Sequence, residues 1–377
     1  MVARVRGQLM VPAGAIVLAL LVGAVIIILT SPLATGGFDP TLPLVTYWAI
    51  IQGSLLSVNG LIDTLVSATP LILVGLSVGF CFKAGLFNIG GQGQFLTGAV
   101  TAAAVGGVLS GAPPFIAAPI AILAAMAMGA IYGFIPGFLK AFTGAHEVVT
   151  TIMLNYIAIQ LVAFLIQGPL RAEGSSFARS ADVGNSAIPV IINMAGGHQA
   201  HLGIIFPFIA AAIIWWVLYR TTIGFEIRTV GANPDAARYA GMRPRLLIVL
   251  AMSVAGLLGG LAGASEILGV SGYMPAAYST NVGFDAITVA LLGRVHPLGI
   301  VFAGLLLGAM RAGAGLMQIQ AGVPVQMIDV LQGVILFFLA ADIVVRRVFR
   351  IHAAAGGVEE LSTVTGTYGG KTTASQP

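Results

Sequence analysis

The chain has 377 residues, of which 58% are hydrophobic and only 8% are charged, and its mean hydropathy is +1.00. A soluble domain carries about 25% charged residues, so this composition excludes a water-soluble fold and indicates an integral membrane protein. The net charge of +4 is carried by the segments between apolar runs and does not indicate binding to nucleic acid.

Ten apolar segments are candidates for membrane-spanning helices, since a span needs about 20 mostly apolar residues. Two of them, 93–110 and 284–295, are short or contain polar residues, and the segment 43–56 is predicted to lie as an amphipathic helix at the membrane surface. We therefore expect an all-α polytopic membrane protein with about ten transmembrane helices, including interrupted or re-entrant segments. The ten candidates are 11–30, 61–82, 93–110, 116–138, 148–168, 203–219, 246–268, 284–295, 297–318 and 326–345.

The distribution of Lys and Arg predicts the orientation, because cytoplasmic loops carry an excess of positive charge. With the N-terminus inside, only Arg171 and Arg179 fall in outer segments. Both termini are then expected in the cytoplasm. Arg4 and Arg6 precede a first apolar run that is longer than the core of a typical signal peptide, which favours an uncleaved span. The expected organisation is a cytoplasmic N-terminus (1–10), a transmembrane permease domain (11–345) with an outer loop (169–202) and a cytoplasmic loop (220–245), and a disordered cytoplasmic tail (346–377).

No pattern in the sequence indicates catalysis, a metal or a cofactor. The stretch GGKTT, residues 369–373, lacks the first glycine of a nucleotide-binding loop, because that position is Thr365. The histidines are scattered without the spacing of metal ligands, and His198 and His201 are interpreted as residues of a solvated loop. We expect a protein that is not an enzyme.

The cytoplasmic segment RTTIGFEIRTVGANPDAARYAGM, residues 220–242, predicts a short helix beneath the membrane. Asn233 is a suitable N-cap, Pro234 suits the first helical position, and Gly241 can end the helix in a left-handed conformation. An interfacial helix resting on lipid would need a broad apolar face. This one offers mostly alanine, so docking to another protein is the favoured interpretation.

Four stretches of the chain resemble a known family. DAARYAG, residues 235–241, is similar to the coupling signature of ATP-binding-cassette (ABC) importer permeases, with Asp235 at the usual Glu position. FKAGLFNIGGQGQFLTGA (82–99), EVVTTIMLNYIA (147–158) and GFDAITVALLGRVHPLGIVFAGLLLGAMRAGA (283–314) resemble the branched-chain amino acid and sugar permease superfamily, most of all its nucleoside and simple-sugar branch. The resemblance implies that the short helix docks on an ATPase subunit. The implied coupling residues are Gly231, Asn233, Asp235, Ala236, Ala237 and Gly241.

The stretch GLFNIGGQGQF, residues 85–95, predicts a broken helix that lines a polar passage, because unpaired backbone is costly against lipid. A glycine-rich hairpin on the cytoplasmic side is the alternative. Asn281-Val282-Gly283 repeats Asn88-Ile89-Gly90 ahead of a later span, as expected for two interrupted segments in corresponding halves. Arg311 is expected to pair with a carboxylate, and the glycines of 256–263, with Gly304 and Gly308, to pack helices. The candidate pathway residues are Asn88, Gly90, Gln92, Gln94, Asn155, Glu266, Asn281 and Asp285.

The expected function is that of the membrane-spanning permease subunit of an ABC importer, powered by a separate ATPase subunit. Neutral amides and a single carboxylate suit an uncharged hydroxylated solute, and the resemblance implies nucleosides or simple sugars, with branched-chain amino acids possible in the wider superfamily. The expected partners are the ATPase, a second and homologous permease subunit, an extracytoplasmic solute-binding protein and the lipid bilayer of a bacterial inner membrane. The alternative is an ion-coupled secondary transporter or channel, which the scarcity of ionisable residues in the spans disfavours.

Overall fold

The described part of the chain, residues 2–194, 197–278 and 280–348, is a bundle of α-helices in this computed structural model. Two π-helical turns, η1 (Leu139–Thr143) and η4 (Ile267–Ser271), extend α5 and α10. The α-helices are α1 (Val2–Thr35), α2 (Leu42–Ser54), α3 (Val58–Lys83), α4 (Gly91–Val108), α5 (Pro114–Phe138), α6 (Glu147–Gln167), α7 (Phe206–Arg220), α8 (Thr222–Ala232), α9 (Pro234–Tyr239), α10 (Pro244–Glu266), α11 (Val282–Leu292), α12 (Pro297–Ala321), α13 (Met327–Ala340) and α14 (Asp342–Val348).

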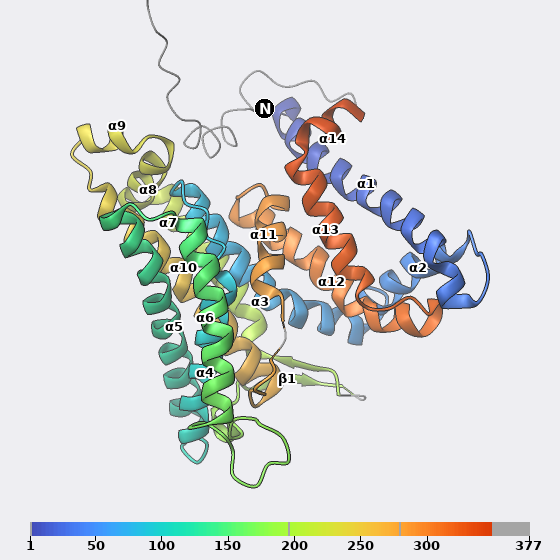
Figure 1. Cartoon of the computed structure of the whole chain (residues 1–377), viewed down its shortest axis with the longest axis horizontal. Coiled ribbons are helices and arrows are strands. Elements are labelled where there is room, and N and C mark those ends of the chain that lie inside the picture. Colours follow the sequence, from blue (N-terminus) through green and yellow to red (C-terminus); the bar gives the residue numbers. More distant parts are fainter. Residues whose placement is uncertain (1, 195–196, 279, 349–377) are drawn as a thin grey trace, which may run out of the picture.

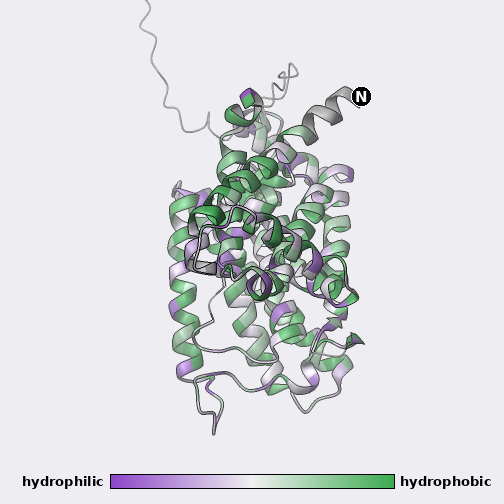
Figure 2. Cartoon of the chain, turned by 90° about the vertical axis from the view of Figure 1, so that its right-hand side faces the viewer, coloured by the Kyte–Doolittle hydropathy of each residue, from purple (hydrophilic) through white to green (hydrophobic). Residues whose placement is uncertain are grey.

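The prediction of a helical, multi-spanning membrane protein is confirmed. Seven of the described helices are long and apolar enough to cross a bilayer, and α11 and α13 are shorter apolar helices. Figure 2 shows hydrophobic residues spread along the long helices from end to end. The count of ten spans and the cytoplasmic location of the termini stay predictions.

One of the two short candidate segments, 284–295, corresponds to α11, which has 11 residues and is therefore roughly 16 Å long, about half of the hydrocarbon core. The sequence did not predict any strand. Within the long loop after α6, β1 (Val190–Asn193) and β2 (Gln199–His201) form a small antiparallel ribbon, and the fold class remains all-α.

The helices are arranged around α3, which lies near the middle of the bundle (Figure 1). On one side are α5, α6, α8 and α9, and on the other are α1, α2, α12 and α13. The short helix α9, the beginning of α1 and the helix α14 lie toward one end of the bundle, called here the α9 end. The β1–β2 ribbon lies toward the opposite end, called here the ribbon end.

Glycines bring the helices into close contact, as the sequence predicts. A Cβ added at Gly256 would meet the backbone oxygen of Gly129 on α5 at 2.1 Å, and one at Gly263 would meet the backbone oxygen of Phe95 on α4 at 2.3 Å. Gly308 on α12 meets Ala68 on α3 in the same way. Small residues therefore let α10 contact α4 and α5 through their backbones, which is how helices associate without a hydrophobic driving force in lipid.

The segment 43–56, predicted to lie at the membrane surface, packs within the bundle as α2. In α2, Leu42 and Ala49 are buried, whereas Leu44 and Trp48 are exposed. The Tyr47 hydroxyl donates a hydrogen bond to the Leu20 carbonyl on α1 at 2.6 Å. The helix α1 runs from Val2 through the predicted N-terminal segment 1–10. Of the predicted tail 346–377, including the stretch 369–373, only residues 346–348 lie within the described residues.

Candidate functional site

The backbone between α3 and α4 returns into the bundle before α4 begins. A Cβ added at Gly91, the first residue of α4, would meet Val74 on α3 at 2.8 Å. Val74 lies nine residues before the end of α3 at Lys83, which corresponds to roughly 14 Å of helix. The helix α4 therefore starts inside the bundle, as predicted for a broken segment, and not in a hairpin at its end.

The helix α11 also starts inside the bundle, directly against the start of α4. A Cβ on Gly283 would meet the backbone nitrogen of Gln92 at 2.1 Å. From this contact α4 runs toward the ribbon end, where Gly106 meets Val183, and α11 runs toward Val295, which lies beside Gly79 near the end of α3. Two half-helices therefore meet by their N-termini and run in opposite directions, an arrangement called here the half-helix junction.

Gln92 joins the two half-helices by hydrogen bonds. Its Oε1 accepts a hydrogen bond from the backbone amide of Gly283 at 2.8 Å, and its Nε2 donates one to the carbonyl of Thr280 at 2.7 Å. The first amides of a helix lack partners within the helix. The Gln92 side chain satisfies one of these amides on α11 although it belongs to α4.

A buried network of amide side chains holds the start of α4. Asn88 Nδ2 donates a hydrogen bond to Gln94 Oε1 at 3.2 Å, and Asn88 Oδ1 accepts one from the Gly90 amide at 3.0 Å. Asn155 on α6 accepts a hydrogen bond from the Gly93 amide at 2.8 Å and donates one to the Ile89 carbonyl at 2.9 Å. These bonds pair the backbone groups that the break in the helix would otherwise leave unpaired.

The predicted pathway residues divide into two groups in the structure. Asn88, Gln92, Gln94 and Asn155 are 1–2% exposed and bond to groups of the chain itself. Their amides therefore already have partners at the half-helix junction. Asn281 is exposed, and Glu266 and Asp285 are partly exposed, so these three are accessible at the surface of this chain.

The accessible polar residues lie on α10, on α11 and on the segment before α11. The carboxyl group of Glu266, at the end of α10, interacts with the hydroxyl of Tyr278. The Tyr278 ring stacks on Phe95 of α4, with 6.4 Å between ring centroids. Glu266 is therefore held beside an aromatic pair, close to the half-helix junction.

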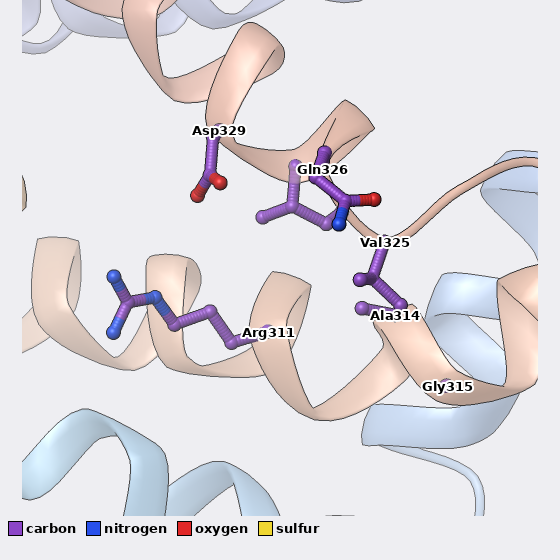
Figure 3. A pocket seen from close by; sticks show the side chains of 7 residues that line it. Arg311, Ala314, Gly315, Val325, Gln326 and Asp329 are labelled. Carbon is purple, nitrogen blue, oxygen red and sulfur yellow. The ribbon is translucent and has the colours of Figure 1, made fainter. Parts of the chain in front are cut away.

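Three charged side chains lie on α11, α12 and α13, and two of them form an ion pair. Asp285 on α11 pairs with Arg311 on α12, which confirms the expectation that Arg311 has a carboxylate partner. Arg311 and Asp329 line a cavity of about 340 Å³ between α12 and α13. Figure 3 shows both side chains reaching into it, from the two helices. Asp329 lies in the first turn of α13, and no pattern in the sequence indicated its position beside this cavity.

The short helix α9 has the predicted caps. Asn233 Oδ1 accepts hydrogen bonds from the amides of Asp235 and Ala236, both at 3.0 Å. At the other end Gly241 has φ +82°, and the Met242 amide donates a hydrogen bond to the Ala237 carbonyl at 3.1 Å. This is the Schellman arrangement that a glycine after the last helical residue favours.

The surface of α9 is largely without contacts in this chain. Of its residues, Ala237 is buried, whereas Asp235, Ala236 and Arg238 are exposed. Tyr239 is 94% exposed, which is the highest exposure of any large hydrophobic residue in the described part of the chain. The sequence interpretation emphasised the alanines of α9 and did not predict that the Tyr239 ring is exposed. Its position within the stretch DAARYAG could have indicated this.

Gly231 connects the α8–α9 segment to the break between α3 and α4. A Cβ at Gly231 would meet the Lys83 carbonyl oxygen at 2.3 Å and the Gly85 nitrogen at 2.8 Å. Gly85 has φ +70°, a conformation that favours glycine. Gly231 is therefore a packing contact between two backbones, while the exposed coupling candidates lie on α9.

The ribbon end contains two histidines in different environments. His198 Nδ1 lies 2.7 Å from Asp63 Oδ2 of α3. His201 is 1% exposed, and neither ring nitrogen has a hydrogen-bond partner in the described part of the chain. The interpretation as a solvated loop residue is therefore wrong for His201, which is buried against Gly269, whereas His198 lies in the turn of the ribbon and stays partly exposed. Burial lowers the pKa of His201 below its ordinary value of 6.5. Among the described residues no group of three or more His, Cys, Asp or Glu is placed to hold a metal ion.

The apolar bundle, the half-helix junction inside it and the projecting helix α9 define a multi-pass membrane transport protein. A family described as the branched-chain amino acid transport system permease component matches residues 60–340, and the chain belongs to this family. Such components are permeases and not enzymes.

The chain is similar to curated permeases with several substrates in their names. It is 39% identical to the guanosine ABC transporter permease protein NupP of Bacillus subtilis, over 90% of this chain and 95% of that one. It is 33% identical to the nucleoside ABC transporter permease protein NupB of Lactococcus lactis, over 90% and 92%. It is also 33% identical to the glucose ABC transporter permease protein TsgB13 of Haloferax volcanii, over 79% and 80%. No solved structure was found to match the chain.

Proposed function

We propose that this chain is one membrane-spanning half of an ATP-driven importer for nucleosides, with simple sugars as the nearest alternative cargo. Its similarity to guanosine and nucleoside permeases over nine tenths of its length supports nucleosides first. The structural observation that carries the proposal is α9, a capped helix that projects Tyr239 and Ala236 from the bundle. ATP is hydrolysed by a separate subunit that docks on this helix.

The structure supplies a physical connection between α9 and the interior of the bundle. Because Gly231 packs on Lys83 and Gly85 without an intervening side chain, displacement of α8 displaces the start of the segment 84–90. That segment ends at α4, whose Gln92 is bonded to the start of α11. Docking at α9 is in this way linked to the half-helix junction through backbone contacts and hydrogen bonds.

The solute passes along the accessible polar wall and not through the buried amide network. Glu266, Tyr278, Asn281 and Asp285 offer hydroxyl, amide and carboxylate groups, which suit hydrogen bonds to the hydroxyls of a sugar or ribose. Asn88, Gly90, Gln92, Gln94 and Asn155 position the half-helices that carry this wall. Asn281 is exposed and Glu266 and Asp285 are partly exposed in this chain, so a second permease subunit, homologous to this one, would complete the passage.

The remaining components follow from this arrangement. The α9 end faces the cytoplasm, where the ATPase acts, and the ribbon end faces the outside, where a solute-binding protein delivers the cargo. The protein is placed in the inner membrane of a bacterial cell. Labelling of single cysteines with a membrane-impermeant maleimide tests this orientation, since the one native cysteine, Cys81, is buried. Tyr239→Cys is expected to react only in inverted vesicles, and Met194→Cys only in intact cells.

The decisive experiment is reconstitution of this chain with its ATPase, second permease and binding protein in vesicles. Uptake of guanosine is expected to need ATP, and to exceed uptake of glucose and leucine. In Ala236→Trp, which adds bulk to the face of α9, the ATPase is expected to copurify poorly. Ser176→Trp, at an exposed position in the long loop after α6, is the matched control and is expected to retain it. Uptake by this chain alone on an ion gradient would refute the proposal in favour of a secondary transporter.

A further inference from the structure

A cavity of about 450 Å³ lies at the α9 end, beside the coupling helix and away from the polar wall. Its lining combines charged and apolar side chains from three elements. Arg238 belongs to α9, Arg243 and Arg245 lie at the start of α10, and Phe142 belongs to η1. Figure 1 shows α9 and α5, which η1 extends, at the same outer edge of the bundle.

The charge of this cavity is positive and weakly compensated. The three arginines are exposed, and in the described part of the chain their one salt bridge joins Arg238 Nη1 to Asp235 Oδ1 at 3.7 Å. Among the described residues no salt bridge involves Arg243 or Arg245. The Arg245 guanidinium lies 5.9 Å from the centroid of the Phe142 ring, which holds it over an aromatic face. The cavity is therefore suited to an anion.

An apolar column leads from this cavity along α5. The rings of Phe134, Phe138 and Phe142 follow one another at 5.7 and 4.8 Å between centroids, because residues four apart lie on one face of a helix. Each of the three is more than 40% exposed, and they belong to a helix that is long and apolar enough to span a bilayer. This column therefore faces hydrocarbon, where a soluble protein would not reach it.

We propose that this cavity binds the phosphate-bearing headgroup of an anionic phospholipid, with an acyl chain along the Phe134–Phe138–Phe142 column. Arginine guanidinium groups bind phosphate oxygens in charge-assisted pairs, and basic pockets at the cytoplasmic side of spans bind anionic headgroups. A free phosphate would use the arginines but not the column. An acidic protein surface would likewise leave the three phenylalanines without a partner.

The bound lipid would contact both α9, through Arg238, and the start of α10. It would therefore hold the base of the coupling helix against the membrane surface. This consequence requires only that the lipid is bound, and the site itself can be tested without transport.

The test measures which lipid the purified chain retains and what stabilises it. The chain is purified in detergent from a membrane that contains phosphatidylglycerol, and the retained lipid is quantified by mass spectrometry. Thermal unfolding is then followed with added phosphatidylglycerol, phosphatidylcholine or inorganic phosphate. We expect retention of phosphatidylglycerol and stabilisation by this lipid alone. The double variant Arg243→Gln/Arg245→Gln should bind it about fivefold more weakly for each arginine removed, roughly 25-fold in total.

Two further variants separate this site from general surface charge and from misfolding. Arg347→Gln removes an exposed arginine of α14, at the same end but outside the cavity, and should retain the lipid fully. Phe138→Ala removes the centre of the column without changing charge, and should weaken retention of the lipid. Equal losses in Arg347→Gln and the double variant would overturn the proposal, as would equal stabilisation by inorganic phosphate. Displacement of the lipid by the ATPase subunit would also overturn it, because the cavity would then belong to the protein interface.

Discussion

The side chain of Gln92 on α4 accepts a hydrogen bond from the amide of Gly283 on α11, with 2.8 Å between Oε1 and the backbone nitrogen. The two residues are 191 positions apart in the chain. Through this bond each half-helix helps to hold the other inside the bundle, where water is not available to replace a lost partner.

Gln92→Leu should destabilise the chain. The substitution leaves the Gly283 amide and the Thr280 carbonyl without partners, and a buried unsatisfied group costs about 1–3 kcal/mol. Thermal unfolding of the purified chain in detergent measures the effect, and ATP-dependent uptake should fall with it. Gln320→Leu is the control, because Gln320 is exposed and, among the described residues, its side chain bonds only to Gln52. Equal stability of the two variants would show that the Gln92 bonds contribute nothing.

Gly283→Ala should lower the stability of the chain strongly, although it adds only one methyl group. The new Cβ would lie 2.1 Å from the Gln92 nitrogen, and both partners are backbone and cannot rotate away. Gly333→Ala, in the middle of α13, meets no atom within 4 Å and should stabilise the chain by up to about 1 kcal/mol, because Ala is the better helix former. Expression level and the unfolding midpoint distinguish the two. If Gly283→Ala matched Gly333→Ala, the close approach of α4 and α11 would be wrong.

Gly231→Ala should separate docking from transport. The added Cβ would lie 2.3 Å from the Lys83 carbonyl oxygen and push α8 away from the segment that leads to α4. The exposed surface of α9 is unchanged, so the ATPase should still copurify, but hydrolysis should no longer drive uptake. Gly315→Ala on α12 has open space and serves as the matched control. Unimpaired uptake by Gly231→Ala would remove this contact from the coupling path.

Arg311→Met should lower stability and the double variant Arg311→Met/Asp285→Asn should restore most of it. The single change leaves the Asp285 carboxylate without its partner, and breaking a buried pair costs about 3–5 kcal/mol. The effect here should be smaller, because the two side chains keep 25% and 15% exposure. A double-mutant cycle on unfolding midpoints measures the coupling. Additive effects would mean that the pair is not energetically linked.

The ribbon should loosen as the pH falls below about 6.5. Burial holds the pKa of His201 below its ordinary value of 6.5, so between these two values the unfolded ribbon binds more protons than the folded one. Stability of the docked ribbon is therefore greatest above this window and is lost as the pH falls through it. Hydrogen exchange of residues 190–201 measures the opening. His201→Leu should remove this pH dependence, whereas His198→Gln should leave it in place; identical pH profiles for wild type and His201→Leu would contradict the assignment.

Features set by neighbouring residues were predictable from the sequence. The caps of α9 follow from Asn233 and Gly241, because each acts on backbone groups within a few positions of itself. The packing role of Gly256 and Gly263 follows from their helical spacing, since glycine is the residue that admits another backbone. Composition alone determined the membrane class, because so few charged residues cannot cover a soluble fold.

Only the tertiary structure decided which distant groups meet. The repeated Asn-x-Gly pattern indicated two interrupted helices, but not that Gln92 would cap α11 or that the amides of 88–94 would be satisfied within the chain. The burial of His201 likewise depends on a ribbon that no local pattern signals. The physical reason is that hydrogen bonds between close neighbours follow from spacing, whereas contacts such as Gln92–Gly283 exist only once the whole chain has been packed.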